Sequence, residues 1–131
     1  MNFETGNLTM EEIEAIFNNL PVDITFVGKD DTVRYFSQTK DRIFPRAKAI
    51  IGKTVQNCHP QKSVDKVNQI VSEFKSKKRD TAEFWINMQD KVVYIRYFAI
   101  RDNEGEYIGT MEVTQDITGI QKINGEKRLM D

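Results

Sequence analysis

Cys58 and His59 are neighbouring residues whose side chains are well suited to chemistry. His59 is the single histidine of the chain and Cys58 the single cysteine. An imidazole can ligate a haem iron or another metal, and an adjacent thiolate is a second possible ligand. The structural alternative is that His59 bonds the backbone near Pro60, at the entrance to a helix, and that Cys58 is a half-buried structural thiol. One histidine and one cysteine fall short of the four ligands of a structural zinc site.

Catalytic motifs are absent from the sequence. The chain has no nucleophile elbow, no phosphate-binding loop and no paired-carboxylate signature. His59 could act as a base, but the sequence places no nucleophile next to it. We therefore expect a protein that is not an enzyme.

A charged pair, Arg96 and Glu112, is the second candidate site. Both residues lie in segments that alternate between two unlike faces, 91–101 and 106–118, which is typical of strands. A three-residue loop ending in Gly105, which can take a left-handed backbone angle, would join these strands as a hairpin. Counting back from this loop predicts the opposed pairs Arg96–Glu112, Phe98–Thr110 and Tyr94–Thr114. If buried, Arg96 and Glu112 should pair or meet a ligand; on a solvated face they would form an ion pair worth about 0–1 kcal/mol.

The remaining segments must position these residues. A helix is expected over 8–20, with a capping box of Thr9 and Glu12 and a stop at Pro21. A second helix is expected from an N-cap at Ser63 to a basic cluster at 75–79. Further strands are predicted at 22–27, 32–36 and 82–88, and short helical turns and loops at 37–53. Two strands, a helical crossing and three strands predict an α+β fold with one five-stranded antiparallel sheet.

This order and several local motifs resemble the PAS sensor domain. The matching features are Ile24-Thr25-Phe26-Val27 with the turn 29–31, His59-Pro60 before a long helix, the loop 101–105, and the terminal Asp116-Ile117-Thr118. The resemblance covers about residues 20–119. It implies a flanking helix at 1–20, a PAS domain at 21–119 and a tail at 120–131. We expect the side chains of Asp116 and Thr118 to hydrogen-bond local backbone where the last strand ends.

The resemblance also implies where a ligand would bind. PAS domains usually hold ligands between the sheet and the crossing segment, and the position two before the terminal aspartate usually points inward. The predicted ligand-binding residues are therefore Tyr94, Arg96, Thr110, Glu112 and Thr114, with His59. Three more segments, 84–85, 95–98 and 109–118, resemble a subgroup more closely. This subgroup is the C-terminal PAS domain of a bacterial and archaeal family often joined to a hemerythrin-like domain, which would make the chain a fragment of a longer protein.

Three functions are compatible with this resemblance. The leading one is a sensory module that binds a small polar ligand and signals as a homodimer. The alternatives are a dimerisation module whose pocket is filled by its own side chains, and a haem redox or gas sensor using His59. A flavin adduct at Cys58 is disfavoured, because the matching position of the last strand carries Thr114 in place of glutamine.

Composition limits the partners. The net charge is −1, so nothing draws the chain onto nucleic acid or an anionic membrane. No apolar run approaches the roughly 20 residues that span a bilayer, and a lone cysteine suits a reducing compartment such as the cytoplasm. A dimer interface is expected on the outer sheet face, with the helix 8–20. The outer face is predicted to present Val93, Ile95, Tyr97, Ala99, Met111 and Val113.

Overall fold

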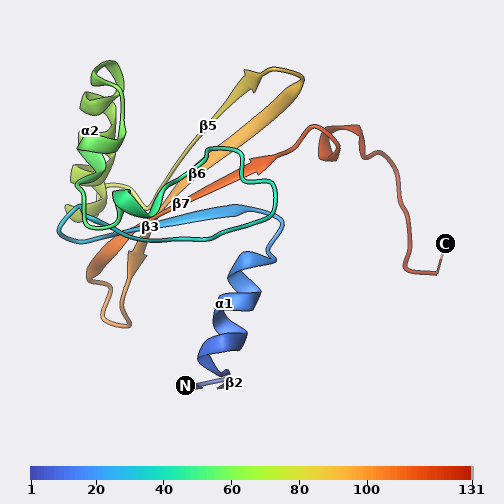
Figure 1. The fold of residues 1–131 in the computed structure, drawn as a ribbon, viewed down its shortest axis with the longest axis horizontal. Coiled ribbons are helices and arrows are strands. Elements are labelled where there is room, and N and C mark those ends of the chain that lie inside the picture. Colours follow the sequence, from blue (N-terminus) through green and yellow to red (C-terminus); the bar gives the residue numbers. More distant parts are fainter. Residues whose placement is uncertain (131) are drawn as a thin grey trace.

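A computed structural model describes residues 1–130, and at its centre lies a five-stranded antiparallel sheet (Figure 1). The order of strands across the sheet is β4-β3-β7-β6-β5, so the last strand is central. The strands are β3 (Asp23–Gly28), β4 (Val33–Phe36), β5 (Thr81–Met88), β6 (Lys91–Arg101) and β7 (Tyr107–Asp116). The predicted α+β fold is confirmed, and the bounds of β6 agree with the prediction.

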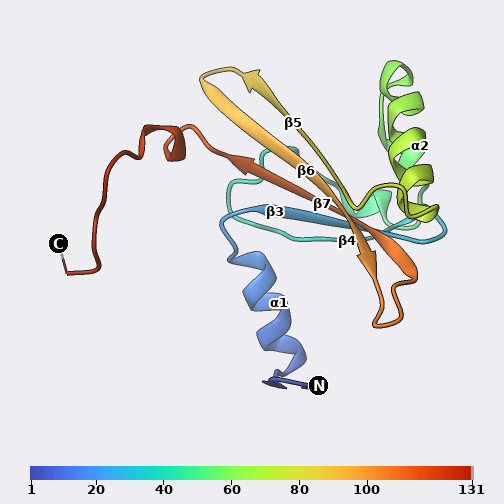
Figure 2. The same ribbon diagram turned by 180° about the vertical axis from the view of Figure 1, so that it is seen from behind.

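Helix α2 (Gln61–Lys75) stands over one end of the sheet, and the β5–β6 hairpin extends away from it (Figures 1 and 2). Its buried stripe is Val67, Val71 and Phe74. The predicted cap at Ser63 is wrong, because the helix begins directly after Pro60. A proline suits a helix start, where its missing N–H is not needed, and Ser63 Oγ instead donates to the Pro60 carbonyl at 3.0 Å.

The segment between β4 and α2 crosses the inner face of the sheet, the face toward α2. It has no long regular element, as predicted, and holds two short 3-10 turns, η1 (Lys48–Ile50) and η2 (Val55–Cys58). Backbone bonds join it to the β3–β4 hairpin: Val33 N donates to the Lys53 carbonyl at 2.9 Å, and Gly52 N to the Val33 carbonyl at 2.8 Å. The crossing segment is thereby fixed at the edge of the sheet.

Helix α1 (Met10–Asn18) projects away from the sheet (Figures 1 and 2). A small hairpin that the sequence did not predict precedes it, made of β1 (Asn2–Phe3) and β2 (Gly6–Asn7). The capping box is confirmed, since Thr9 N donates to Glu12 Oε1 at 2.8 Å and Glu12 N to Thr9 Oγ1 at 3.0 Å. No residue of α1 is buried, although the ring of Phe17 contacts that of Tyr35. Its apolar stripe is therefore open to solvent.

The pairing of β6 with β7 differs by one residue from the prediction. The loop forms as expected, with Gly105 at φ +82° and Asp102 N donating to the Glu106 carbonyl at 2.9 Å. Beyond the loop, Arg101 is opposite Tyr107 but Ile100 is opposite Gly109, so Ile108 is an extra residue in β7. Such a bulge shifts every later pair by one, and a shift of one residue exchanges the two faces of a strand.

This bulge reverses the predicted faces of β6. Glu112 is opposite Tyr97, and Arg96 is opposite Val113. The prediction that Arg96 and Tyr94 share a face with Glu112 is therefore wrong. The predicted apolar outer face is wrong for its four β6 residues, which lie on the inner face, and correct for the two from β7. The inner residues are Val93, Ile95, Tyr97 and Ala99, and the outer ones Met111 and Val113.

Asp116 and Thr118 secure the end of β7. Thr118 Oγ1 accepts from Val92 N at 2.9 Å, and Asp116 Oδ1 accepts from the N–H and hydroxyl of Thr118 at 3.0 and 2.6 Å. The predicted local bonds are confirmed. The tail then begins with a 3-10 turn, η3 (Ile120–Lys122), and leaves the sheet (Figure 1). Of the predicted tail 120–131, residue 131 lies outside the described residues. Within 1–130, neither α1 nor α2 is long and apolar enough to cross a membrane.

Candidate functional site

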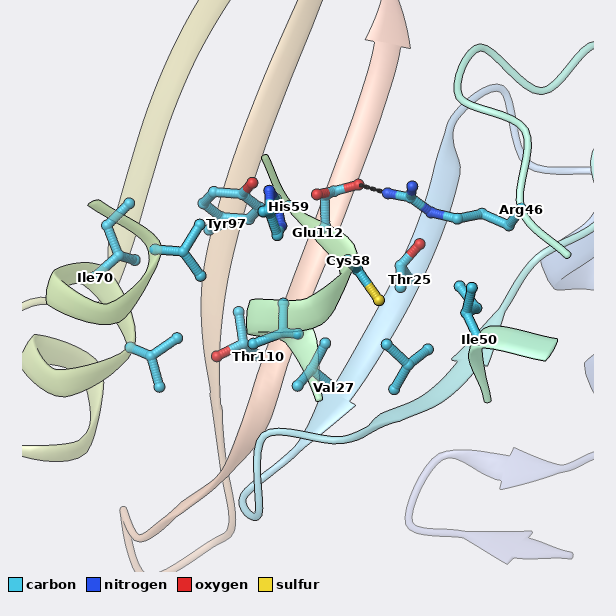
Figure 3. Close-up of a pocket in the computed structure, with 14 residues that line it drawn as sticks. Thr25, Val27, Arg46, Ile50, Cys58, His59, Ile70, Tyr97, Thr110 and Glu112 are labelled. Carbon is cyan, nitrogen blue, oxygen red and sulfur yellow. Dashed lines mark hydrogen bonds and ion pairs between the residues drawn. The ribbon is translucent and has the colours of Figure 1, made fainter. Parts of the chain in front are cut away.

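A cavity of about 40 Å³ lies between the inner face of the sheet, the crossing segment and α2 (Figure 3). Most of its wall is aliphatic, contributed by β3, β4, the crossing segment and α2. These side chains are Val27, Val33, Ile50, Val55, Val67, Ile70 and Val71. The polar lining side chains include Arg46, His59, Tyr97 and Glu112, which lie in one row across the cavity in Figure 3. The cavity is therefore apolar along most of its wall and polar at one end.

An ion pair between Arg46 and Glu112 defines the polar end. Arg46 Nη2 lies 3.2 Å from Glu112 Oε1, and the two side chains are only 21% and 13% exposed. Glu112 stands in the middle of the central strand, whereas Arg46 comes from the irregular crossing segment 66 residues earlier. Arg46 Nε is buried and has no hydrogen-bond partner among the described residues. A buried donor without a partner is costly, so the site has an unused capacity to bind an acceptor.

Tyr97 and His59 are uncharged neighbours of this ion pair. Burial raises the pKa of the Tyr97 phenol, and the charge of Glu112 and a hydrogen bond to it raise this pKa further. Burial lowers the pKa of His59 below its ordinary value of 6.5; the carboxylate of Glu112 opposes this and the guanidinium of Arg46 adds to it. At neutral pH the phenol keeps its proton and the imidazole is neutral.

A second guanidinium, that of Arg42, fixes the start of the crossing segment. Its Nη2 donates to Thr25 Oγ1 at 2.8 Å and its Nη1 to the Ser37 carbonyl at 2.9 Å. The carboxylate of Asp23 accepts from Ile43 N at 2.8 Å and interacts electrostatically with Arg42. These bonds tie residues 37–43 to β3, and this anchoring sets where Arg46 can reach.

Three of the predicted ligand-binding residues line the cavity: His59, Thr110 and Glu112. Thr114 is buried on the same inner face but does not line the cavity. Thr110 Oγ1 lies 2.7 Å from the hydroxyl of Tyr107, so its hydroxyl already has a partner.

Arg96 and Tyr94 lie on the outer face, because the bulge at Ile108 shifts the pairing of β6 with β7 by one residue. Their predicted role in the cavity is therefore wrong. The guanidinium of Arg96 lies over the rings of Tyr94 and Phe98, 4.8 and 5.7 Å from their centroids. Arg46 and Tyr97 line the cavity in place of the predicted Arg96 and Tyr94. The sequence carried no signal for Arg46, because it lies in a segment without a period.

The haem alternative does not fit this cavity. His59 lines it, but a cavity of about 40 Å³ is far too small for a porphyrin, since even benzene needs a cavity of about 150 Å³. The thiol of Cys58 donates to the Thr54 carbonyl at 3.5 Å, which fits a structural role. Within residues 1–130, no group of three or more His, Cys, Asp and Glu side chains is placed to hold a metal ion.

His59 should make the stability of the fold depend on pH. Because burial lowers its pKa in the folded state, the unfolded chain takes up the proton more readily. The free energy of unfolding is therefore highest above about pH 6.5, the ordinary pKa of histidine. It decreases as the pH falls from there through the lower pKa of the folded state. We expect the wild type to lose more of this free energy between about pH 7.5 and pH 5.5 than His59→Gln, in urea titrations. Since His59 is the single histidine, parallel losses in both proteins would contradict its burial in a neutral form.

Comparisons with known proteins agree with this fold. A family model described as a PAS domain matches residues 13–118. A crystal structure of a C-terminal domain from Streptococcus mutans is 33% identical, covers 95% of this chain and 96% of its own, and superposes with a TM-score of 0.89. No curated protein matches the chain.

More distant solved structures share the fold alone. A sensory box sensor histidine kinase from Vibrio cholerae is 11% identical over 81% of this chain and 89% of its own, with a TM-score of 0.57. The VqmA dimer of Vibrio cholerae is 20% identical over 86% of this chain and 54% of its own, with a TM-score of 0.62. The predicted fold is confirmed, whereas the hemerythrin-associated subgroup is not.

Proposed function

The chain belongs to the PAS domain family, and from that premise we propose that it is a sensory module which binds a small ligand in the cavity under α2 and signals as a homodimer. The observation that carries the proposal is the ion pair of Arg46 and Glu112 at one end of an otherwise aliphatic cavity. Ligand sites combine mostly apolar walls with a few convergent polar groups in this way.

The position of Glu112 supports a signalling role. It lies on β7, four residues before Asp116, whose bonds to Thr118 hold the point where the tail leaves the sheet. Arg46 lies on the crossing segment, so one ligand can contact both the crossing segment and the central strand. A ligand that alters the Arg46–Glu112 contact would then bias the geometry of the tail, provided that it binds the two arrangements with different affinity.

Two uncovered apolar surfaces support the homodimer. The outer sheet face presents Trp85, which is 64% exposed, beside Tyr94, and α1 presents Met10 and Ile16, 70% and 44% exposed. Apolar surfaces of this kind usually mark an interaction site. We propose that α1 of one subunit packs on the outer sheet face of the other, in the cytoplasm, where Cys58 would remain reduced.

The alternatives receive less support. A pure dimerisation module would fill its pocket with its own side chains, but a cavity remains here. Cys58 gives no support to a catalytic role, since its thiol donates to the Thr54 carbonyl. We also propose that the chain comes from a longer protein, consistent with the resemblance to a C-terminal domain.

Native mass spectrometry of the purified chain tests ligand and dimer together. We expect a dimer that retains a small molecule. Ile70→Trp, which fills the cavity from α2, should abolish retention, whereas Gln69→Trp on the exposed side of the same helix should not. Trp85→Glu should dissociate the dimer and leave the cavity intact. A species that stays monomeric in sedimentation at high micromolar concentration would contradict the dimer, and equal retention in both tryptophan variants would contradict the site.

A further inference from the structure

The polar end of the cavity carries no net charge. Arg46 and Glu112 form a one-to-one ion pair at 3.2 Å. Burial keeps His59 neutral by lowering its pKa and Tyr97 neutral by raising its pKa. The cavity therefore offers a ligand no uncompensated charge of either sign.

The nearest other charges are balanced as well. Arg42 lies behind Thr25, and its interaction with Asp23 is the largest charge effect on it. The carboxylate of Asp23 is engaged by the backbone of Ile43 and the hydroxyl of Thr39. No excess charge from this second layer reaches the cavity.

A charged ligand would therefore be disfavoured in this site. An anion would compete with Glu112 for Arg46, and a cation would compete with Arg46 for Glu112. Each would leave one buried group of the pair, or the ligand itself, without a counter-ion, and an unpaired buried charge is expensive. A neutral hydrogen-bonding group incurs no such penalty. Arg46 Nε supplies a donor that has no partner among the described residues, and the Glu112 carboxylate can accept.

The size and lining of the cavity define the rest of the ligand. About 40 Å³ corresponds to only a few non-hydrogen atoms, since one water needs about 10–15 Å³. The wall away from the polar end is made of valine and isoleucine side chains, among them Val27, Val67 and Ile70. An aliphatic chain would lose its contact with water against these residues, which favours binding.

Building on the proposed function, we propose that the ligand is a neutral molecule of about three or four non-hydrogen atoms, with a short aliphatic body and one hydrogen-bonding head. Its head lies against Arg46 and Glu112 and its body against β3 and α2. Short-chain amides and alcohols belong to this class. An anionic ligand would be expected only if the arginine on the inner face had no acidic partner, whereas Arg46 is paired with Glu112.

Three two-carbon probes of matched planar shape, each with four non-hydrogen atoms, test the charge preference: acetamide, acetate and acetamidinium. Each is titrated into the ¹⁵N-labelled 131-residue chain, and the backbone amide signals of cavity residues such as Val27, Ile70 and Glu112 are followed by NMR. We expect saturable shifts with acetamide, and a dissociation constant at least about tenfold lower than for either charged probe.

Two variants should exchange the preference. Glu112→Gln leaves the charge of Arg46 without its partner and should make acetate the preferred probe. Arg46→Gln leaves the charge of Glu112 without its partner and should make acetamidinium the preferred probe. Glu106→Gln is the control, because it breaks an exposed ion pair with Lys77 outside the cavity and should leave the order of the probes unchanged.

The outcomes separate this inference from the proposed function. A wild-type protein that prefers acetate or acetamidinium at the same amides overturns the neutral-ligand inference and leaves a ligand-binding cavity. A wild-type protein whose cavity amides respond to no probe, and which retains no molecule in native mass spectrometry, overturns both. Variants that keep the wild-type order of probes overturn the charge argument even when acetamide binds best.

Discussion

Replacing Gly109 by alanine is expected to destabilise the domain by about 3 kcal/mol. Gly109 lies in the central strand β7, opposite Gly28 of β3. A Cβ at this position would clash with the backbone carbonyl oxygen of Val27 and would lie 2.5 Å from Cζ of Phe26. The ring of Phe26 can rotate, but the carbonyl of Val27 is fixed by the pairing of β3 with β7. The strands would therefore have to separate at the middle of the sheet.

Urea unfolding at neutral pH measures this effect, and Gly119→Ala is the matched control. A Cβ at Gly119 meets nothing within 4 Å, and its φ of −70° suits any residue. We expect the control to stay within about 0.5 kcal/mol of the wild type. If Gly109→Ala is as stable as the control, the close approach of β3 to β7 described above is wrong.

The elements of this fold could be predicted because their signals are local. The capping box of Thr9 and Glu12, the left-handed Gly105 and the bonds between Asp116 and Thr118 each depend on residues a few positions apart. The alternation of residues 91–101 likewise reports directly on a strand. These features were predicted correctly because little beyond the segment itself is needed to form them.

The register of the sheet could not be predicted from the same signals. Loop chemistry correctly placed the hairpin, but the extra residue at Ile108 leaves no mark in the alternation of the strand. One such residue moved Arg96 from the inner to the outer face and Tyr97 to the inner face. The site residues of β7 were therefore predicted on the correct face of the sheet, and those of β6 on the wrong face.

Arg46 shows a second limit of the sequence. Its partner Glu112 is 66 residues away, and the crossing segment around it has no period that would assign its side chain to a face. Its position depends on tertiary anchors, chiefly the bonds of Arg42 to Thr25 and Ser37. Pairing between an irregular segment and a strand becomes visible only when both are placed in space.

Separating Arg46 from Glu112 is the other change from which we expect a large effect. Arg46→Met would leave the Glu112 carboxylate, 13% exposed, without its cation. Removing one partner of a well-buried pair costs about 3–5 kcal/mol, and residual exposure reduces this here to about 2–3 kcal/mol. Glu112→Leu should cost less, about 1–2 kcal/mol, because the longer Arg46 side chain, 21% exposed, can turn toward water.

The double variant Arg46→Met/Glu112→Leu should be nearly as stable as the wild type, because replacing both charges by apolar side chains leaves neither one unpaired. Urea titrations of the four proteins give the coupling energy, expected at about 2 kcal/mol or more. Costs that simply add would show that the two side chains do not interact. Recovery in the double variant would mean that the fold does not need this ion pair for stability. If that variant has also lost its retained small molecule, the pair serves recognition, since a cavity of the same shape with an apolar end offers no group to hold the head of a ligand.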